Sequence, residues 1–329
     1  MKRNAVRATL KGRSVDPQAR KDVEALLAAA QKKTGVDPRR RDLLIENLHR
    51  IQDRYGHLSA AHLAALAQAM RLSQTEVYEV ATFYHHFDVV KEGEAAPAPL
   101  TVRVCDSIAC ALAGADALLE RLPGVLGREV RVLHAPCVGR CETAPVAVVH
   151  QNPLGHASVE AVQRAVRAKK TACPTPEAID YAQYRRSGGY RLIADCLAGK
   201  HEREAITKIM EDAGLRGLGG AGFPAGRKWR ILAGMPAPRL MAVNIDEGEP
   251  GTFKDRGYLE RDPHRFLEGM LVAAWCAGVG EIYIYLRDEY AGCRALLERE
   301  LDRLKAKPPC ALPPIHLRRG AGAYICGEE

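Results

Sequence analysis

The chain has 329 residues, 47% hydrophobic and 27% charged, a composition typical of a globular protein long enough for two or three domains. The net charge of +8 gathers in residues 1–56, where basic residues decorate helical patterns with Tyr55 as the only aromatic, so nucleic-acid binding is disfavoured. No apolar run approaches the roughly 20 residues that a membrane span needs, and ten cysteines without a secretory segment indicate a reducing compartment, so we expect a cytoplasmic protein without membrane insertion.

The first predicted elements are helices within residues 16–90. Apolar residues recur three and four apart in 22–33 and 42–56, as on the buried face of a helix. Ser59 and Ser73 stand where N-caps are expected, and Glu76 follows Ser73 as in a capping box. The segment KEGEAAPAPL then predicts a linker. We therefore expect residues 1–92 to form a solvated helical arm that faces a partner.

The hydrophobic period changes after the linker. Residues 100–105 and 128–137 alternate like strands, residues 144–158 predict a hairpin that turns at 152–155, and two helical patterns, 111–122 and 159–170, complete the unit. The order β-α-β-β-α predicts a small thioredoxin-like sheet. Its cysteines follow the carboxyl ends of two strands, which is where open α/β sheets place ligands.

Four cysteines in this unit form two closely spaced pairs, Cys105 with Cys110 and Cys137 with Cys141. Structural zinc sites favour tighter C-x2-C knuckles, whereas a [2Fe–2S] cluster takes four cysteines, two on each iron. The surrounding "APCVGRCETAP" supplies small residues and backbone N–H groups that can bond cluster sulfurs. The spacing favours the cluster and leaves a zinc site and buried structural thiols as alternatives.

The first 170 residues resemble the 24-kDa-type [2Fe–2S] subunit of respiratory complex I. The likeness lies in "VYEVATFYHHF" and in the pattern "CDSIAC…CVGRC", with a shorter gap between the two cysteine pairs than in that subunit. The resemblance implies a thioredoxin-like domain over residues 100–170. It also implies a [2Fe–2S] cluster bound by Cys105, Cys110, Cys137 and Cys141.

The proline-bearing residues 171–180 predict a boundary, and the second half that follows is α/β as well. Helical patterns cover 188–197 and 203–215, and later 265–278 and 289–304; strand patterns cover 239–245 and 281–286, and a final segment covers 314–329. We expect this half to form a separate domain over residues 181–329.

A glycine-rich segment, "GLRGLGGAGFPAGRKW", lies between 214 and 229, and its Gly217, Gly219 and Gly222 spell G-x-G-x-x-G. A dinucleotide fingerprint must follow a strand and open a helix. Here a helical pattern precedes the glycines, and residues 223–226, Phe-Pro-Ala-Gly, are expected to break any helix. The segment predicts instead a loop whose amides approach a phosphate or a flat ring, with Lys228 neutralising the phosphate. A flexible surface turn is the alternative.

Acidic residues cluster just after the strand pattern 239–245. Asn244, Asp246, Glu247 and Glu249 fall within six residues, and they suit a solvated loop, a hard-cation site, paired acids for hydrolysis, or acceptors for ribose and ring N–H groups. The spacing of a Ca²⁺-binding loop is absent.

Residues from about 180 onward resemble the 51-kDa-type flavoprotein subunit of complex I and its relatives. Three ordered motifs carry the likeness: "GLRGLGGAGFPAGRKW", "NIDEGEPGTFKDR" and "GAGAYICGEE". The resemblance implies FMN held by Gly217, Gly219, Gly220, Lys228, Asn244, Asp246, Glu247, Tyr324, Gly327 and Glu328. It implies NAD(H) against Phe223, Glu249 and Glu329, with no residue acting as a catalytic acid or base.

Two departures accompany this resemblance. Leu218 stands where the family usually has arginine. The family also continues past "CGEE" to a C-x2-C-x2-C run that binds a [4Fe–4S] cluster. We therefore expect a truncated chain whose FMN/NAD-binding domain lacks that part, with a [4Fe–4S] cluster only if the chain continues beyond Glu329.

The two modules together resemble the fused diaphorase (beta) subunit of soluble NAD-dependent formate dehydrogenases. We expect an α/β protein with a helical arm, a thioredoxin-like [2Fe–2S] domain and an α/β FMN-binding domain. The resemblance implies an oxidoreductase that passes electrons to NAD⁺ from a formate dehydrogenase alpha subunit containing molybdenum or tungsten and further iron–sulfur clusters. The alternatives are a diaphorase subunit of an NAD-reducing hydrogenase, a complex I-like NADH dehydrogenase, and a non-enzymatic zinc-binding scaffold or assembly protein.

Overall fold

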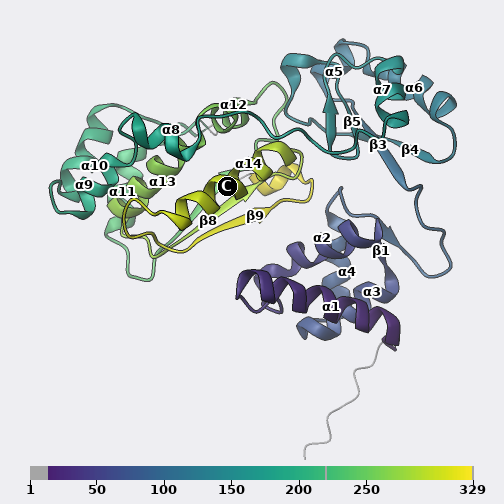
Figure 1. Cartoon of the computed structure of the whole chain (residues 1–329), viewed down its shortest axis with the longest axis horizontal. Helices are drawn as coiled ribbons and strands as arrows, with labels where there is room; N and C mark the ends of the chain where they lie inside the picture. Colours follow the sequence, from purple (N-terminus) through teal and green to yellow (C-terminus); the bar gives the residue numbers. More distant parts are fainter. Residues whose placement is uncertain (1–13, 219–220, 328–329) are drawn as a thin grey trace, which may run out of the picture. The chain divides into compact units, whose positions relative to one another are not determined.

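The computed structural model describes residues 14–218 and 221–327 and divides into two compact units, whose elements are labelled in Figure 1. One unit comprises residues 1–99 with Ala321–Ala323, and the other comprises residues 100–320 with Tyr324–Glu329. The segment 1–13 lies outside the described residues.

The first unit is a bundle of helices. They are α1 (Pro17–Thr34), α2 (Leu44–Tyr55), α3 (Ala60–Met70) and α4 (Gln74–Phe83), accompanied by η1 (Arg41–Leu43) and by the parallel pair β1 (Leu58–Ser59) and β2 (Val89–Val90). Apolar faces bury Leu27, Leu48 and Leu66 in one core. Both predicted N-caps are confirmed, because Ser59 accepts from the N–H of His62 and Ser73 from that of Glu76.

The second unit begins with a four-stranded sheet in the order β4-β3-β5-β6, in which β3 and β4 are parallel and the other pairs antiparallel. Its elements are β3 (Leu100–Cys105), α5 (Ile108–Leu112), α6 (Ala115–Leu126), β4 (Val130–Ala135), η2 (Cys141–Thr143), β5 (Ala147–Val149), β6 (Asn152–Leu154) and α7 (Val159–Arg167). The predicted strand and helical segments are therefore observed, with β5 and β6 as the two strands of the hairpin and α5 as an additional short helix, so the full order is β-α-α-β-β-β-α rather than β-α-β-β-α.

The hairpin turn was placed wrongly at 152–155. The chain turns at 150–151, where His150 adopts a left-handed φ of 58°, and Asn152 and Pro153 belong to strand β6. A proline is acceptable there because β6 is an edge strand, so its missing N–H interrupts no ladder.

The rest of this unit is a second α/β layer with three parallel strands in the order β7-β8-β9. Its elements are α8 (Tyr181–Arg186), α9 (Arg191–Leu197), α10 (Arg203–Asp212), α11 (Ala225–Ala233), β7 (Leu240–Ile245), α12 (Lys254–Arg261), α13 (Pro263–Ala277), β8 (Glu281–Leu286), α14 (Ala291–Ala306), β9 (Ile315–Arg319) and η3 (Tyr324–Gly327). Parallel strands bring their carboxyl ends to one edge; polar segments follow β7 and β8 there, and the small residues Gly-Ala-Gly-Ala, 320–323, follow β9.

The expected helix break at 223–226 is wrong, because α11 begins at Ala225 directly after Pro224. Proline is compatible with the start of a helix, where its missing N–H has no intrahelical partner. Gly226 serves the packing of α11 on α10, since a Cβ there would lie 2.7 Å from the backbone nitrogen of Glu211. The glycine loop does open a helix, so helix α10 before it is what excludes the dinucleotide fingerprint.

Three fully buried polar side chains are joined by hydrogen bonds in the core beside α13 and α14. The Tyr190 hydroxyl lies 2.7 Å from His264 Nδ1, and His264 Nε2 lies 2.9 Å from a Glu300 oxygen. Burial lowers the pKa of His264. Burial alone would raise the pKa of Glu300, but hydrogen bonds from His264, the Arg299 side chain and a backbone N–H lower it overall. The contacts fit a neutral imidazole that donates to a carboxylate.

Stability is expected to fall as the pH drops below 6.5, the ordinary pKa of His264, because the unfolded chain then binds a proton that the folded chain resists. The pKa of Glu300 is also lowered in the folded chain, so Glu300 adds to the loss of stability below pH 4.5, its ordinary pKa. Urea unfolding at several pH values measures the free energy of unfolding, and this should depend less steeply on pH in His264→Gln than in the wild type. The exposed His201→Gln serves as control, and equal slopes for wild type and His264→Gln would contradict the assignment.

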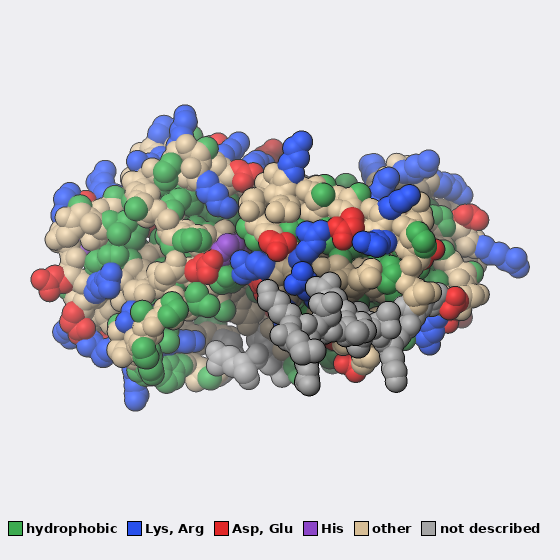
Figure 2. All heavy atoms as spheres, turned by 90° about the horizontal axis from the view of Figure 1, so that it is seen from below, with side chains coloured by type: hydrophobic (Ala, Val, Ile, Leu, Met, Phe, Trp, Pro, Cys, Tyr) green, Lys and Arg blue, Asp and Glu red, His purple; other side chains and the backbone are tan. Residues whose placement is uncertain are grey.

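No helix among the described residues is both long and apolar enough to cross a bilayer. On the face drawn in Figure 2, Lys and Arg side chains lie among acidic and apolar ones.

Candidate functional site

The four predicted ligand cysteines lie together at one end of the thioredoxin-like sheet. Cys105 ends β3, Cys110 lies in α5, Cys137 follows β4, and Cys141 begins η2. The first three are buried, with at most 4% of each exposed. Strand ends and one short helix thus bring two pairs of thiols to one place, as the spacing predicted.

The sulfur atoms form a continuous chain of contacts. Cys137 and Cys141 Sγ lie 3.4 Å apart, and Cys105 is hydrogen-bonded to Cys137 and to Cys110. Two neighbouring pairs of thiols are the donor set of a two-iron cluster. The residues present therefore fit a [2Fe–2S] cluster.

Backbone N–H groups also point at these sulfurs. Gly139 N–H donates to Cys137 Sγ at 3.4 Å, and Gly251 N–H donates to Cys141 Sγ at 3.1 Å. The hydrogen bond with Cys137 lowers the pKa of Cys105, while burial raises the pKa of Cys141. Donors aimed at sulfur stabilise negative charge there, which is what thiolate ligands carry.

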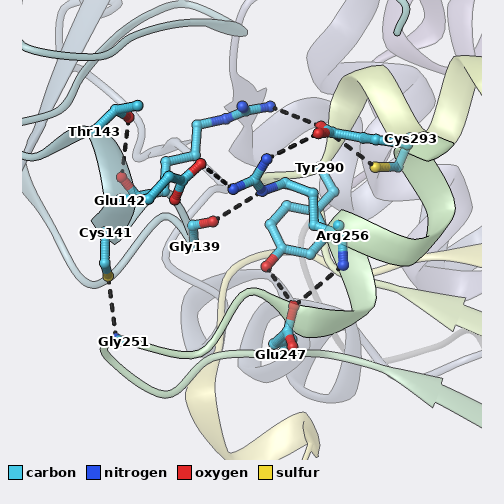
Figure 3. Close-up of polar contacts among 12 residues, drawn as sticks. Gly139, Cys141, Glu142, Thr143, Glu247, Gly251, Arg256, Tyr290 and Cys293 are labelled. Carbon is cyan, nitrogen blue, oxygen red and sulfur yellow. Dashed lines mark hydrogen bonds and ion pairs between the residues drawn. The ribbon is translucent and has the colours of Figure 1, made fainter. Parts of the chain in front are cut away.

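Gly251 belongs to the second α/β layer, so the cysteine loop and that layer are in direct contact. We call residues 137–142 the cluster loop and residues 246–251 the acidic turn. Arg256 of α12 donates from Nε to the Gly139 carbonyl at 3.0 Å and from its terminal nitrogens to Glu142 and Glu260 (Figure 3). Arg256 is 5% exposed, so its guanidinium is shielded from water, while the carboxylates of Glu142 and Glu260 stay partly exposed.

A second buried arginine joins the same two segments. Arg287 follows β8 and donates to the Cys137 carbonyl at 2.6 Å, to the Glu247 carbonyl, and to the Glu289 carboxylate. Burial alone would lower the pKa of Arg287, but Glu289 raises it. Arg287 therefore stays charged while it holds a carbonyl of the cluster loop and one of the acidic turn.

Glu247 is the most enclosed residue of the acidic turn, with 1% of its side chain exposed. Its carboxylate accepts from the Tyr290 hydroxyl at 2.9 Å and from the backbone N–H groups of Asp255 and Arg256. Tyr290 also packs on the cluster loop, because a Cβ added to Gly139 would lie 2.6 Å from a Tyr290 ring carbon. These bonds make the Glu247 carboxylate an anchor of the turn.

Two other predicted flavin residues, Asn244 and Tyr324, lie near the carboxyl ends of β7 and β9 and are exposed to solvent. Asn244 is exposed at the end of β7, and its side-chain oxygen accepts from the N–H of Asp246 at 2.9 Å. Tyr324, half exposed in η3, reaches Glu249 with its hydroxyl at 3.5 Å and covers Gly248. The structure thus brings the second and third sequence motifs together.

Two backbone hydrogen bonds join the ends of the glycine loop, which comprises the glycine-rich residues 214–226. Gly217 N–H donates to the Phe223 carbonyl at 3.0 Å, and Ala225 N–H donates to Leu215 at 2.8 Å. Phe223 is exposed with Arg227 above its ring, and Lys228 lies exposed on α11. Four predicted positions, Gly219, Gly220, Glu328 and Glu329, lie outside the described residues, and of Gly327 only its place in η3 is described.

Reasoning from the sequence missed Arg256, Arg287 and Tyr290 as members of the site. A signal was present for two of them, because the charged run Arg-Asp-Glu-Tyr at 287–290 directly follows the apolar strand β8. Polar residues at the carboxyl end of a parallel strand are candidates for a site.

Comparison with known proteins identifies both parts. Residues 28–170 match the family described as thioredoxin-like [2Fe–2S] ferredoxin, and residues 210–329 match the Nuo51 FMN-binding domain. The mitochondrial 51 kDa subunit of NADH-ubiquinone oxidoreductase from Neurospora crassa is 44% identical over 163 residues, which cover 46% of this chain and 33% of that protein.

Two further similarities extend over both parts. The alpha subunit of the NAD-reducing hydrogenase HoxS of Cupriavidus necator is 30% identical over 334 residues, covering 88% of this chain and 54% of that protein. A crystal structure of an NAD⁺-reducing [NiFe]-hydrogenase in the H2-reduced state superposes with a TM-score of 0.71 at 30% identity, covering 87% of this chain and 52% of that one. The chain spans about half or less of the length of these relatives.

Proposed function

We propose that this chain, which carries a thioredoxin-like [2Fe–2S] domain followed by an FMN-binding domain, is the NAD(H)-linked electron-transfer subunit of a multi-subunit oxidoreductase. FMN exchanges a hydride with NAD(H) and single electrons with iron–sulfur centres. The chain's own residues bind and orient these groups. No side chain is required as an acid or base.

The observation that carries this proposal is the junction between the cluster loop and the acidic turn. The backbone N–H of Gly251 reaches a sulfur 110 residues earlier in the chain, and Arg256 and Arg287 donate to two carbonyls of the cluster loop. An electron-transfer subunit requires its flavin and its cluster to be close. This junction supports that arrangement, because the acidic turn is one of the proposed flavin-binding segments.

We propose that the flavin lies over the carboxyl edge of β7, β8 and β9. Lys228 and the amides of the glycine loop would hold its phosphate, Asn244 and Asp246 would accept from polar groups of the cofactor, and Tyr324 would flank it. Glu247 would orient the turn through its internal bonds. Phe223 and Glu249 would face the nicotinamide nucleotide, and Gly217, Gly219, Gly220, Gly327, Glu328 and Glu329 complete the proposed set.

Replacing Lys228 with alanine is expected to weaken FMN binding about 10- to 100-fold, because a charge-assisted hydrogen bond contributes about 1.5–3 kcal/mol. Fluorescence titration of the flavin-depleted chain measures the dissociation constant. Lys208→Ala, which removes an exposed lysine paired with Asp212 on α10, is the matched control. Equal affinities for the two variants would remove Lys228 from the proposed site.

The finer part of the proposal concerns the partner, a formate-oxidising subunit that contains molybdenum or tungsten and sends electrons to NAD⁺. The compact "CDSIAC…APCVGRC" arrangement and the glycine in "DEGEPG" support it. A hydrogenase partner is the second candidate, supported by the 88% of this chain that aligns with the HoxS alpha subunit. Formate-dependent or hydrogen-dependent reduction of NAD⁺ by a complex with each catalytic subunit distinguishes them.

Spectroscopy of anaerobically purified protein tests the proposal against a zinc-binding scaffold. Flavin absorption bands, a reducible [2Fe–2S] signal and NADH:ferricyanide activity are expected. A colourless protein with one zinc ion per chain would refute the electron-transfer function. Flavin retention is the primary readout, since it depends on fewer residues than turnover does.

A further inference from the structure

The two buried arginines that hold the cluster loop both come from the FMN-binding domain. Arg256 lies on α12 and Arg287 follows β8, yet their guanidinium groups donate to the carbonyls of Gly139 and Cys137. One of these carbonyls belongs to a cluster ligand and the other lies two residues from it. Figure 3 shows Arg256 between the cluster loop and the acidic turn.

The same arginines are bonded to the acidic turn. The backbone N–H of Arg256 donates to a Glu247 carboxylate oxygen at 3.3 Å, and Arg287 donates to the Glu247 carbonyl. The turn also supplies the N–H that reaches Cys141 Sγ. The position of the cluster loop and that of the acidic turn are therefore fixed by the same two residues, Arg287 through its side chain and Arg256 through its side chain and its backbone N–H.

The buried charges of Arg256 and Arg287 act on the cluster together with the carboxylates that pair with them, which are Glu142 and Glu260 for Arg256 and Glu289 for Arg287. Replacing either arginine removes a positive charge and leaves its carboxylates uncompensated, and both changes disfavour reduction of the cluster. Arg256 and Arg287 are 5% and 4% exposed, so little solvent screens them, and electrostatic interactions are stronger there than at the surface. Reducing a [2Fe–2S] cluster by one electron adds one negative charge to it. Nearby cations and N–H donors to sulfur stabilise that added charge and raise the reduction potential.

We propose that Arg256 and Arg287 are positioning residues through which the FMN-binding domain raises the reduction potential of the [2Fe–2S] cluster. They act through the carbonyls of the cluster loop and by keeping Gly251 N–H at Cys141. The proposal goes beyond the proposed function, because it concerns the cluster alone and requires neither NAD(H) nor a partner subunit.

The test is a redox titration of the full chain with dithionite and mediators, monitored by the EPR signal of the reduced cluster. Arg256→Gln and Arg287→Gln are each compared with wild type and with Arg261→Gln. Arg261 lies on the same helix as Arg256, is exposed, and bonds to the Gly257 carbonyl. This control removes the same charge without a described contact to the cluster loop.

At the ambient potential where the wild-type cluster is half reduced, each glutamine variant is expected to show an about tenfold lower ratio of reduced to oxidised cluster. That ratio corresponds to about 59 mV for a one-electron couple. Arg256→Lys, which keeps the charge, should retain most of the wild-type potential. Arg261→Gln should match wild type.

Two results would overturn the proposal. One is a potential in both glutamine variants equal to that of Arg261→Gln. The other is loss of the cluster from both glutamine variants, which would assign the arginines to folding alone. If only one variant keeps its cluster, its potential decides the question. Because dithionite is the reductant, a chain without NADH activity still gives this answer, so failure of the proposed function is distinguished.

Discussion

Cys137→Ser is expected to abolish the [2Fe–2S] cluster, and the iron and sulfide content of the protein should fall to background. Cys137 occupies the middle of the sulfur chain, where it contacts both Cys105 and Cys141, and a serine hydroxyl is a poor replacement for a thiolate. Loss of an outer-sphere partner typically costs 10- to 100-fold in metal affinity, and losing a ligand should cost more. Iron analysis, visible absorption and EPR of the reduced protein measure the effect.

The matched control is Cys310→Ser. Cys310 is partly exposed and lies between α14 and β9, and its substitution should leave the cluster intact. Full iron content and an unchanged EPR signal in Cys137→Ser would exclude Cys137 as a ligand. A parallel measurement of zinc identifies any single-ion site at the same cysteines.

Gly139→Ala is expected to destabilise the second unit by about 2–5 kcal/mol. The residue has a φ of 67°, which costs an L-residue about 1–2 kcal/mol. The added Cβ would also lie 2.6 Å from a ring carbon of Tyr290, which is fully buried, and overpacking of this kind costs about 1–3 kcal/mol. Chemical unfolding of the cluster-loaded chain measures the change in stability.

Gly114→Ala separates the two contributions. Gly114 also has a positive φ and lies in the same thioredoxin-like domain, but a Cβ there would meet nothing within 4 Å. Its substitution should show the backbone cost alone. If Gly139→Ala were no more destabilising than Gly114→Ala, the contact between the cluster loop and Tyr290 would not contribute to stability.

The elements that the sequence predicted well are those whose information is local. Cys105 ends a strand and Cys110 lies just beyond it, so an alternating pattern followed by two thiols was enough to place that pair. The α/β fold and the cofactor classes, a [2Fe–2S] cluster and FMN, are confirmed by the two family matches. The individual flavin and nucleotide residues stay predictions.

The features that the sequence did not predict depend on contacts between distant segments. Arg256 contacts Glu142, which is 114 residues away in the sequence, and Arg287 contacts Cys137, which is 150 residues away. The hydrophobic period of a short stretch of sequence carries no information about such pairs. The helix α11 was missed for a different reason. Pro224 and Gly226 were taken as breakers, but a proline at a helix start and a glycine at a tight helix contact are both compatible with a helix.

The segment between α7 and α8, residues 168–180, has a consequence for how the junction is maintained. A short tether holds two surfaces at an effective concentration in the millimolar range. The contacts of Arg256, Arg287 and Gly251 therefore do not have to overcome the entropy of bringing two free proteins together. Dilution cannot separate the cluster loop from the acidic turn, so the few hydrogen bonds between them can be selected for orientation rather than for affinity.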